Sequence, residues 1–202
     1  MIYLTIIRHG ETIQNLHKLC QGQQPGKLSP KGLKQVKKLA ERLKDETTDV
    51  FYSSDLYRAL ETSQAILSFH PEWNLIKDPL LRERYMSSWE GKPFPKNWNW
   101  SYLPEGAETT KDMIDRARAV VSKIQKNDEG KKVMVVTHGS FIKALLTVLF
   151  NKTEADFFSW EEPKNTGVSS FELYPDGKVK VIEKNNIDHL DAETQPVDCM
   201  PK

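Results

Sequence analysis

Short apolar runs alternate with amphipathic stretches along the chain. Ile2 to Ile7 and Val133 to Thr137 are nearly continuous, β-branched apolar runs, and Asp49 to Ser53 is a weaker third run. Such runs are typical of strands that are buried on both faces of a parallel sheet. Each run is followed by apolar residues spaced three or four apart, which is the pattern of a helix with one apolar face. The sequence therefore predicts an α/β fold with three layers, in which a mostly parallel sheet carries helices on both faces.

Four helices are expected. Ser29 before Pro30 marks the start of the first, Ser54 is expected to cap a second over 55–69, a third spans about 109–126, and the fourth follows Thr137. The residues expected on their buried faces are, in chain order, Leu33, Val36, Leu39, Ala40 and Leu43; Leu56, Leu60, Ser63 and Leu67; Met113, Ala117, Val120, Val121 and Ile124; and Phe141, Leu145 and Leu149.

The last third of the chain predicts an antiparallel edge and a tail. Residues 168–174 and 178–183 alternate in polarity around Pro175-Asp176-Gly177, which is a turn signal, so we expect an antiparallel hairpin at one edge of the sheet. We expect residues 1–190 to form one domain and 191–202 to be a disordered tail.

The helical and strand periodicity fails between Glu83 and Glu108. This irregular segment, about 84–107, contains Trp89, Trp98 and Trp100. Long irregular stretches inside a compact domain are usually functional. We interpret this one either as a lid over the site, suited to a substrate with an apolar or ring-bearing part, or as a peripheral flap with a small core of its own.

Composition excludes several kinds of protein. The chain has 202 residues and a formal net charge of +1, with 29 Lys and Arg against 28 Asp and Glu, so it lacks the basic excess of proteins that bind nucleic acid or anionic lipid. No apolar run approaches the roughly 18 residues of a membrane span. Cys20 and Cys199 are far apart, which suggests neither a disulfide framework nor a thiolate metal site. We expect a cytoplasmic protein with no nucleic-acid or membrane partner.

Cationic side chains follow the predicted strands. Arg8 and His9 end the first strand, His138 follows Thr137, and Arg58 falls at the start of the helix after the third strand. Ligands of open α/β sheets bind outside the carboxyl ends of the strands, so these four side chains are expected to converge. Such a cluster requires an anion, and arginine forks suit phosphate. A neutral imidazole, kept neutral by nearby arginines, is a nucleophile toward phosphorus.

Several motifs support a more specific interpretation. They are IIRHGETIQN (6–15), QG (21–22), LSPKGLKQ (28–35), YSSDLYRALETSQ (52–64), LRERYMSSWEG (81–91), VVTHGSFIKALL (135–146) and NTGVS (165–169). The motifs occur in the order typical of the histidine phosphatase superfamily, the phosphoglycerate mutase-like proteins. The chain resembles this superfamily over about residues 3–190. Within that superfamily the chain is most similar to the small bacterial broad-specificity phosphatases.

The resemblance implies a role for each matching residue. His9 corresponds to the histidine that becomes phosphorylated, Glu83 to the proton donor, and the other pocket residues are Arg8, Arg58 and His138. Asn15 corresponds to a further phosphate contact, and Gln21 and Gly22 to a loop that lines the substrate site. No cofactor or metal is implied. One departure is that Ser87 stands where many relatives carry the glycine of a G-x-W-E-G pattern.

The function expected from these features is metal-independent hydrolysis of small-molecule phosphate monoesters through a phosphohistidine intermediate, by a monomer or homodimer. Two alternatives remain. Arg82 and Arg84 beside Glu83 could hold a second phosphate, as in a 2,3-bisphosphoglycerate-dependent phosphoglycerate mutase or a sugar-bisphosphate phosphatase. A non-catalytic phosphate-binding scaffold on the same fold is the alternative from a different class of protein.

Overall fold

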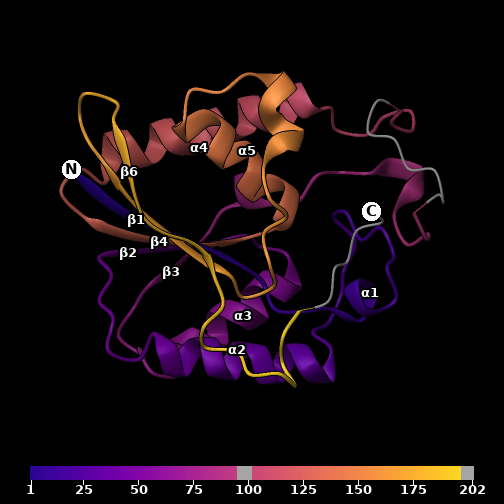
Figure 1. Cartoon of the computed structure of the whole chain (residues 1–202), viewed down its shortest axis with the longest axis horizontal. Coiled ribbons are helices and arrows are strands. Elements are labelled where there is room, and N and C mark those ends of the chain that lie inside the picture. Colours follow the sequence, from indigo (N-terminus) through magenta and orange to yellow (C-terminus); the bar gives the residue numbers. More distant parts are fainter. Residues whose placement is uncertain (95–101, 197–202) are drawn as a thin grey trace.

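The computed structural model, which describes residues 1–94 and 102–196, is built on a six-stranded sheet in the order β3-β2-β4-β1-β5-β6 (Figure 1). The first four strands in this order are parallel to one another, whereas β5 is antiparallel to both β1 and β6. The predicted mostly parallel sheet with an antiparallel edge is therefore confirmed. The strands are β1 (Ile2–Arg8), β2 (Val50–Ser53), β3 (Leu75–Lys77), β4 (Lys132–Thr137), β5 (Val168–Leu173) and β6 (Val179–Asn186).

Helices cover both faces of the sheet. α2 (Pro30–Arg42) and α3 (Tyr57–Leu67) lie on one face, and α4 (Thr110–Asn127) and α5 (Gly139–Leu149) lie on the other (Figure 1). Side chains of β1 alternate between the layers: Ile6 packs in the core with α4 and α5, whereas Ile7 packs in the core with α2 and α3. Most side chains of β1 are buried in one core or the other, which accounts for its apolar sequence, whereas Tyr3 and Thr5 are partly exposed. The predicted three-layer architecture is confirmed.

Short elements complete the structure described. They are α1 (Ile13–Leu16) and three 3₁₀ turns at Pro79–Leu81, Ser87–Trp89 and Glu154–Ser159. No helix in the two described ranges is long and apolar enough to cross a membrane.

The predicted start of α3 is wrong. This helix begins at Tyr57, and its N-cap residue is Leu56, which provides no side-chain cap. The Ser54 hydroxyl lies instead 2.8 Å from Nε2 of His138. The predicted faces of α2 and α3 are also partly wrong, because Leu33 is 51% exposed and the buried apolar and hydroxyl residues of α3 are Ala59, Thr62, Ser63 and Ile66.

The chain does not become disordered at residue 191. The hairpin of β5 and β6 forms as predicted, but residues 187–196 then run along α2 (Figure 1). Leu190 and Thr194 are buried there, and Lys38 of α2 pairs with Asp191 at 2.8 Å. The prediction of a disordered tail is therefore wrong for 191–196, while 197–202 lie outside the described residues.

The irregular segment is described on both sides of residues 95–101. Trp89 lies near Tyr102, with ring centroids 5.9 Å apart, whereas Trp98 and Trp100 lie outside the described residues. Ser87, where the resemblance implies a glycine, has a left-handed φ of +50°. Glycine adopts this conformation at lower cost than serine. The Ser87 hydroxyl donates a hydrogen bond to the Glu105 carbonyl at 2.7 Å, so the turn is held in spite of the departure.

Candidate active site

Four predicted side chains meet at the carboxyl end of the parallel strands. β1 ends before His9, β4 ends before His138, and the first turn of α3 directs Arg58 between the two imidazoles. The Arg58 Nε–H lies 3.2 Å from Nε2 of His9 and 3.1 Å from Nδ1 of His138, and the two ring centroids are 5.0 Å apart. Arg8 lies in the same cavity. The convergence expected from the strand ends is present.

The protein backbone fixes which nitrogen of His9 carries the proton. Nδ1 of His9 lies 2.7 Å from the Gly10 carbonyl, and a carbonyl only accepts, so Nδ1 carries the hydrogen. The lone pair of Nε2 is then free to accept from Arg58, and Nε2 is on the side of the ring that faces the cavity. His9 therefore presents an unprotonated nitrogen to the cavity.

His138 is held in a complementary way. Because its Nδ1 accepts from Arg58, its Nε2 carries the proton and donates to the Ser54 hydroxyl. Ser54 thus orients a ring nitrogen instead of capping a helix. Both imidazoles are neutral in this arrangement, and Arg58 contacts both of them.

The cavity between these groups has a volume of about 70 Å³. One side is polar and another is apolar, with Leu19, Cys20, Met86 and Phe94 among its lining residues. The full lining is Arg8, His9, Asn15, Leu19, Cys20, Gln21, Gly22, Arg58, Glu83, Arg84, Met86, Phe94, Ser140 and Glu162. Every residue predicted for the site lines this cavity except His138, which contacts it through Arg58.

Two buried donors in the cavity wall have no protein acceptor. Nη1 of Arg8 bonds to the Pro163 carbonyl and lies 3.4 Å from Glu162 Oε1, but Nε of Arg8 has no hydrogen-bond partner within residues 1–94 and 102–196. The same is true of Nε2 of Gln21. Buried donors are nearly always paired in folded proteins. A phosphoryl group bound in the cavity would bring acceptors that such donors lack.

The loop that carries Gln21 also holds the far side of Arg58. Nη2 of Arg58 donates to the Gly22 carbonyl at 2.8 Å, and Nη1 donates to the Gln24 carbonyl at 3.3 Å. Gly22 has a φ of +54°, and a Cβ there would lie 2.0 Å from the Glu90 carboxylate. The position therefore requires glycine, which explains the Gln-Gly pair in the sequence.

Glu83 and Asn15 lie at the same cavity. The Glu83 carboxylate accepts from the backbone N–H of Arg84 at 2.8 Å and of Ser140 at 3.2 Å, so it sits at the N-terminus of α5. Asn15 accepts through Oδ1 from the Thr12 N–H at 3.2 Å. Both side chains are partly exposed, which leaves them accessible to a ligand in the cavity.

Burial dominates the electrostatics of the two imidazoles. The pKa of His9 lies well below 6.5, first because the ring is buried and then because Arg58 and Arg8 repel the imidazolium form. The pKa of His138 is lowered by the same causes, burial again being the largest. The prediction that arginines lower these pKa values has the right direction, but desolvation is the larger cause. Burial also lowers the pKa of Arg58, to about 10, so this guanidinium stays charged at neutral pH.

These directions predict the pH dependence of the site. Because the pKa of His9 lies well below 6.5, we expect kcat/KM to show no protonation step of His9 near pH 6.5 once the second ionisation of the phosphate, near pH 6, is accounted for. Stability changes instead. Unfolded histidines take up protons below 6.5 and the buried ones do not, so the free energy of unfolding is greatest above pH 6.5 and falls as pH decreases.

A pH–rate profile and urea unfolding at several pH values check both statements. A wild-type kcat/KM profile with a protonation step near pH 6.5, in excess of the substrate's own ionisation, would contradict the assignment. So would a free energy of unfolding that does not decrease between pH 6.5 and 5.

Both arginines considered for a second phosphate have protein partners. Arg82 pairs with Asp55 at 2.7 Å. Arg84 is only 1% exposed, donates to the Thr110 hydroxyl at 2.7 Å and lies over the Phe157 ring. Arg84 is therefore a buried residue, and no local pattern in the sequence indicates its surroundings.

Two polar lining residues, Ser140 and Glu162, were not predicted. Ser140 could have been found, because the sequence HGS directly before a helical pattern marks a helix N-terminus with free amides. Glu162 bridges Arg8 and Lys143, with its two carboxylate oxygens at 3.4 and 2.7 Å from them. It lies in a loop without periodicity, so the sequence contains no signal for it.

The fold and the cavity together define a class of protein: an α/β protein in which the strand ends bring two imidazoles and two guanidinium groups together at one cavity. The family model of the histidine phosphatase superfamily (branch 1) matches residues 4–186. The chain belongs to this superfamily, as the sequence motifs indicated.

Individual relatives agree with this assignment. The chain is similar to phosphoglycerate mutase-like protein 4 of Arabidopsis thaliana, at 29% identity over 93% of this chain and 86% of that protein. It is 35% identical to a metal-independent phosphoserine phosphatase of the same plant, over 70% of this chain and 66% of that protein. The solved structure of YhfR from Bacillus stearothermophilus superposes with a TM-score of 0.85 at 28% identity, covering 94% of this chain and 99% of that one.

Proposed function

We propose that this chain is a phosphatase that hydrolyses small-molecule phosphate monoesters through a phosphohistidine intermediate on His9. The observation that carries the proposal is the pairing of a fixed, unprotonated Nε2 on His9 with buried donors on Arg8 and Gln21 that lack acceptors in the described protein. A phosphoryl group fits this arrangement, because its oxygens accept these hydrogen bonds while its phosphorus faces Nε2. The family and its phosphatase members support the same reaction class.

The first chemical step transfers the phosphoryl group to the protein. Nε2 of His9 forms a bond to phosphorus while the bond from phosphorus to the ester oxygen breaks, and protonated Glu83 gives its proton to the departing alkoxide. Arg8 and Arg58 stabilise the charge on the phosphoryl oxygens, and Asn15 is the further contact. His138, held by Ser54 and Arg58, lies beside the group in transfer.

The second step uses water. The Glu83 carboxylate removes a proton from a water molecule, whose oxygen bonds to phosphorus as the P–N bond to His9 breaks. This restores neutral His9 and protonated Glu83 and releases inorganic phosphate. The position of Glu83 at the cavity supports its part in both proton transfers.

The alternatives are less well supported. A mutase or bisphosphate phosphatase needs a second cationic subsite, and Arg82 and Arg84 are bound to Asp55 and to Thr110. A non-catalytic scaffold has no need of an oriented imidazole nucleophile, yet the Gly10 carbonyl orients His9 at 2.7 Å.

A kinetic panel tests the proposal. Release of inorganic phosphate is measured from p-nitrophenyl phosphate, phosphoserine, 3-phosphoglycerate and fructose 1,6-bisphosphate, with and without 2,3-bisphosphoglycerate. We expect hydrolysis of monoesters with no requirement for the bisphosphate. Isomerisation of 3-phosphoglycerate that exceeds hydrolysis and depends on that primer would establish a mutase, and binding without any turnover would establish a scaffold.

We also propose a cellular location, an oligomeric state and a set of partners for the enzyme. We place it in the cytoplasm as a single domain over residues 1–190, onto which residues 191–196 dock. We propose that it is monomeric or homodimeric and acts on a small phosphate monoester, without nucleic-acid or membrane partners and without cofactor or metal. The near-neutral net charge of +1 supports the proposed lack of nucleic-acid and anionic-lipid partners.

A further inference from the structure

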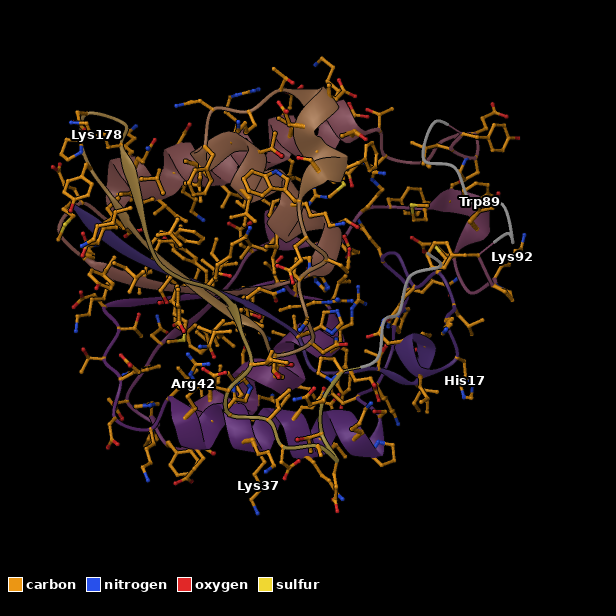
Figure 2. All side chains as sticks on the ribbon, viewed as in Figure 1. His17, Lys37, Arg42, Trp89, Lys92 and Lys178 are labelled. Atoms are coloured by element: carbon orange, nitrogen blue, oxygen red, sulfur yellow. The ribbon has the colours of Figure 1, made fainter. Side chains whose placement is uncertain are left out.

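The C-terminal segment 187–196, here named the strap, is docked on α2. Arg42 of α2, which lies between the helix and the end of β6 in Figure 2, donates to Asn186 Oδ1 at 2.7 Å. Asp191 and Thr194 close a turn on each other, with the Thr194 hydroxyl 2.7 Å from Asp191 Oδ1. The turn leaves the Thr194 carbonyl facing α2, where its partner is Gln35.

Gln35 connects the strap to the loop of the nucleophile. Its side chain is completely buried. Nε2 of Gln35 donates to the Thr194 carbonyl at 2.8 Å, and Oε1 accepts from the Glu11 N–H at 2.8 Å. Because an amide has its donor and its acceptor on opposite sides, the strap carbonyl decides that the oxygen of Gln35 faces Glu11.

The Glu11 N–H belongs to the same peptide unit as the Gly10 carbonyl. In a trans peptide these two groups point in opposite directions, so holding the N–H fixes the direction of the carbonyl. That carbonyl accepts from Nδ1 of His9 at 2.7 Å. A continuous series of hydrogen bonds therefore runs from Thr194 through Gln35 and this peptide unit to the imidazole. Such chains of amides polarise one another, which strengthens each bond.

The neighbouring backbone groups of the loop are held by other partners. The Gly10 N–H donates to the Thr62 hydroxyl at 3.1 Å, and the Glu11 carbonyl accepts from the Ser29 N–H at 2.8 Å. Gln35 is thus the side chain that holds the one peptide unit on which the His9 tautomer depends.

We propose that Gln35 is a positioning residue through which the docked strap keeps the proton of His9 on Nδ1 and so leaves Nε2 available to phosphorus. The inference rests on the proposed function of His9 as nucleophile. It assigns a role in the reaction to residues 191–196 of the strap, which the sequence predicts to be part of a disordered tail.

The test uses the full chain labelled with [¹⁵N]histidine. In the wild type, NMR is expected to show His9, assigned by comparison with His9→Ala, as the Nδ1–H tautomer. Gln35→Met keeps the side-chain size but removes both hydrogen bonds. We expect it to give a mixture of His9 tautomers and to lower kcat about tenfold while KM stays within about twofold.

Two further variants separate positioning from stability. Leu39→Ala removes a buried apolar side chain from the same helix, so we expect a lower melting temperature with unchanged tautomer and kcat. Asp191→Ala loosens the exposed turn of the strap and should shift the tautomer and kcat in the same direction as Gln35→Met, by a smaller factor.

The outcomes are distinct. If Gln35→Met keeps the Nδ1–H tautomer or wild-type kcat, or if Leu39→Ala changes the tautomer as much, the positioning role is overturned. If the tautomer shifts in Gln35→Met but the wild type hydrolyses no phosphate monoester, the positioning role holds and the proposed function fails.

Discussion

Replacing His9 by alanine is expected to lower kcat for phosphate release by about 10⁴-fold or more, because the group that forms the covalent bond to phosphorus is lost. The buried donors of Arg8 and Gln21 remain, so binding of inorganic phosphate should persist. The measurement is phosphate release from p-nitrophenyl phosphate, together with phosphate binding by isothermal titration calorimetry.

His17→Ala is a matched control for His9→Ala. His17 is exposed at the end of α1, and it is labelled at the surface in Figure 2. It should retain wild-type kcat. Turnover by His9→Ala within about tenfold of the wild type would show that another group, or water directly, attacks phosphorus.

Replacing Arg58 by alanine is expected to lower kcat/KM by about 10³-fold. Arg58 contacts both imidazoles and holds the loop of Gly22, so its loss removes a phosphoryl contact and loosens the wall of the cavity. Arg58→Lys should restore little of the lost kcat/KM. An ammonium group is a compact charge and cannot reach the several acceptors that the planar guanidinium contacts at once. Removing this cation also raises the pKa of His9. The fall in rate caused by protonation of His9 should therefore occur at higher pH in Arg58→Ala than in the wild type.

Arg118→Ala provides the control for loss of an arginine. Arg118 is an exposed residue of α4 that pairs only with its neighbour Asp115 among the described residues. The Arg118→Ala variant should have the kcat/KM of the wild type. An Arg58→Ala enzyme with kcat/KM near that of the wild type would mean that the cluster binds no phosphoryl group during the reaction.

The sequence was sufficient to predict the centre of the site because strand ends define it. The apolar runs 2–7 and 133–137 are buried on both faces and are therefore visible without tertiary information, and parallel strands necessarily bring His9 and His138 to one edge. Arg58 follows because α3 starts beside that edge.

What the sequence could not predict depends on partners that are distant along the chain. Ser54 looks like a helix cap, and only the position of β4 shows that His138 engages its hydroxyl. Arg84 follows the charged residues Arg82 and Glu83, and its burial results from contacts with Thr110 and Phe157. The strap is polar and aperiodic, so its order comes from α2 and not from its own composition.

The central claim is that phosphorus is transferred to Nε2 of His9. Full-length protein is mixed with a ³²P-labelled monoester, quenched in alkali with detergent, and the labelled peptide is identified by mass spectrometry. We predict a label on His9 that survives alkali, is lost in acid and is absent from His9→Ala. Recovery of the label on serine, cysteine or aspartate, or rapid turnover without any labelled protein, would contradict the claim.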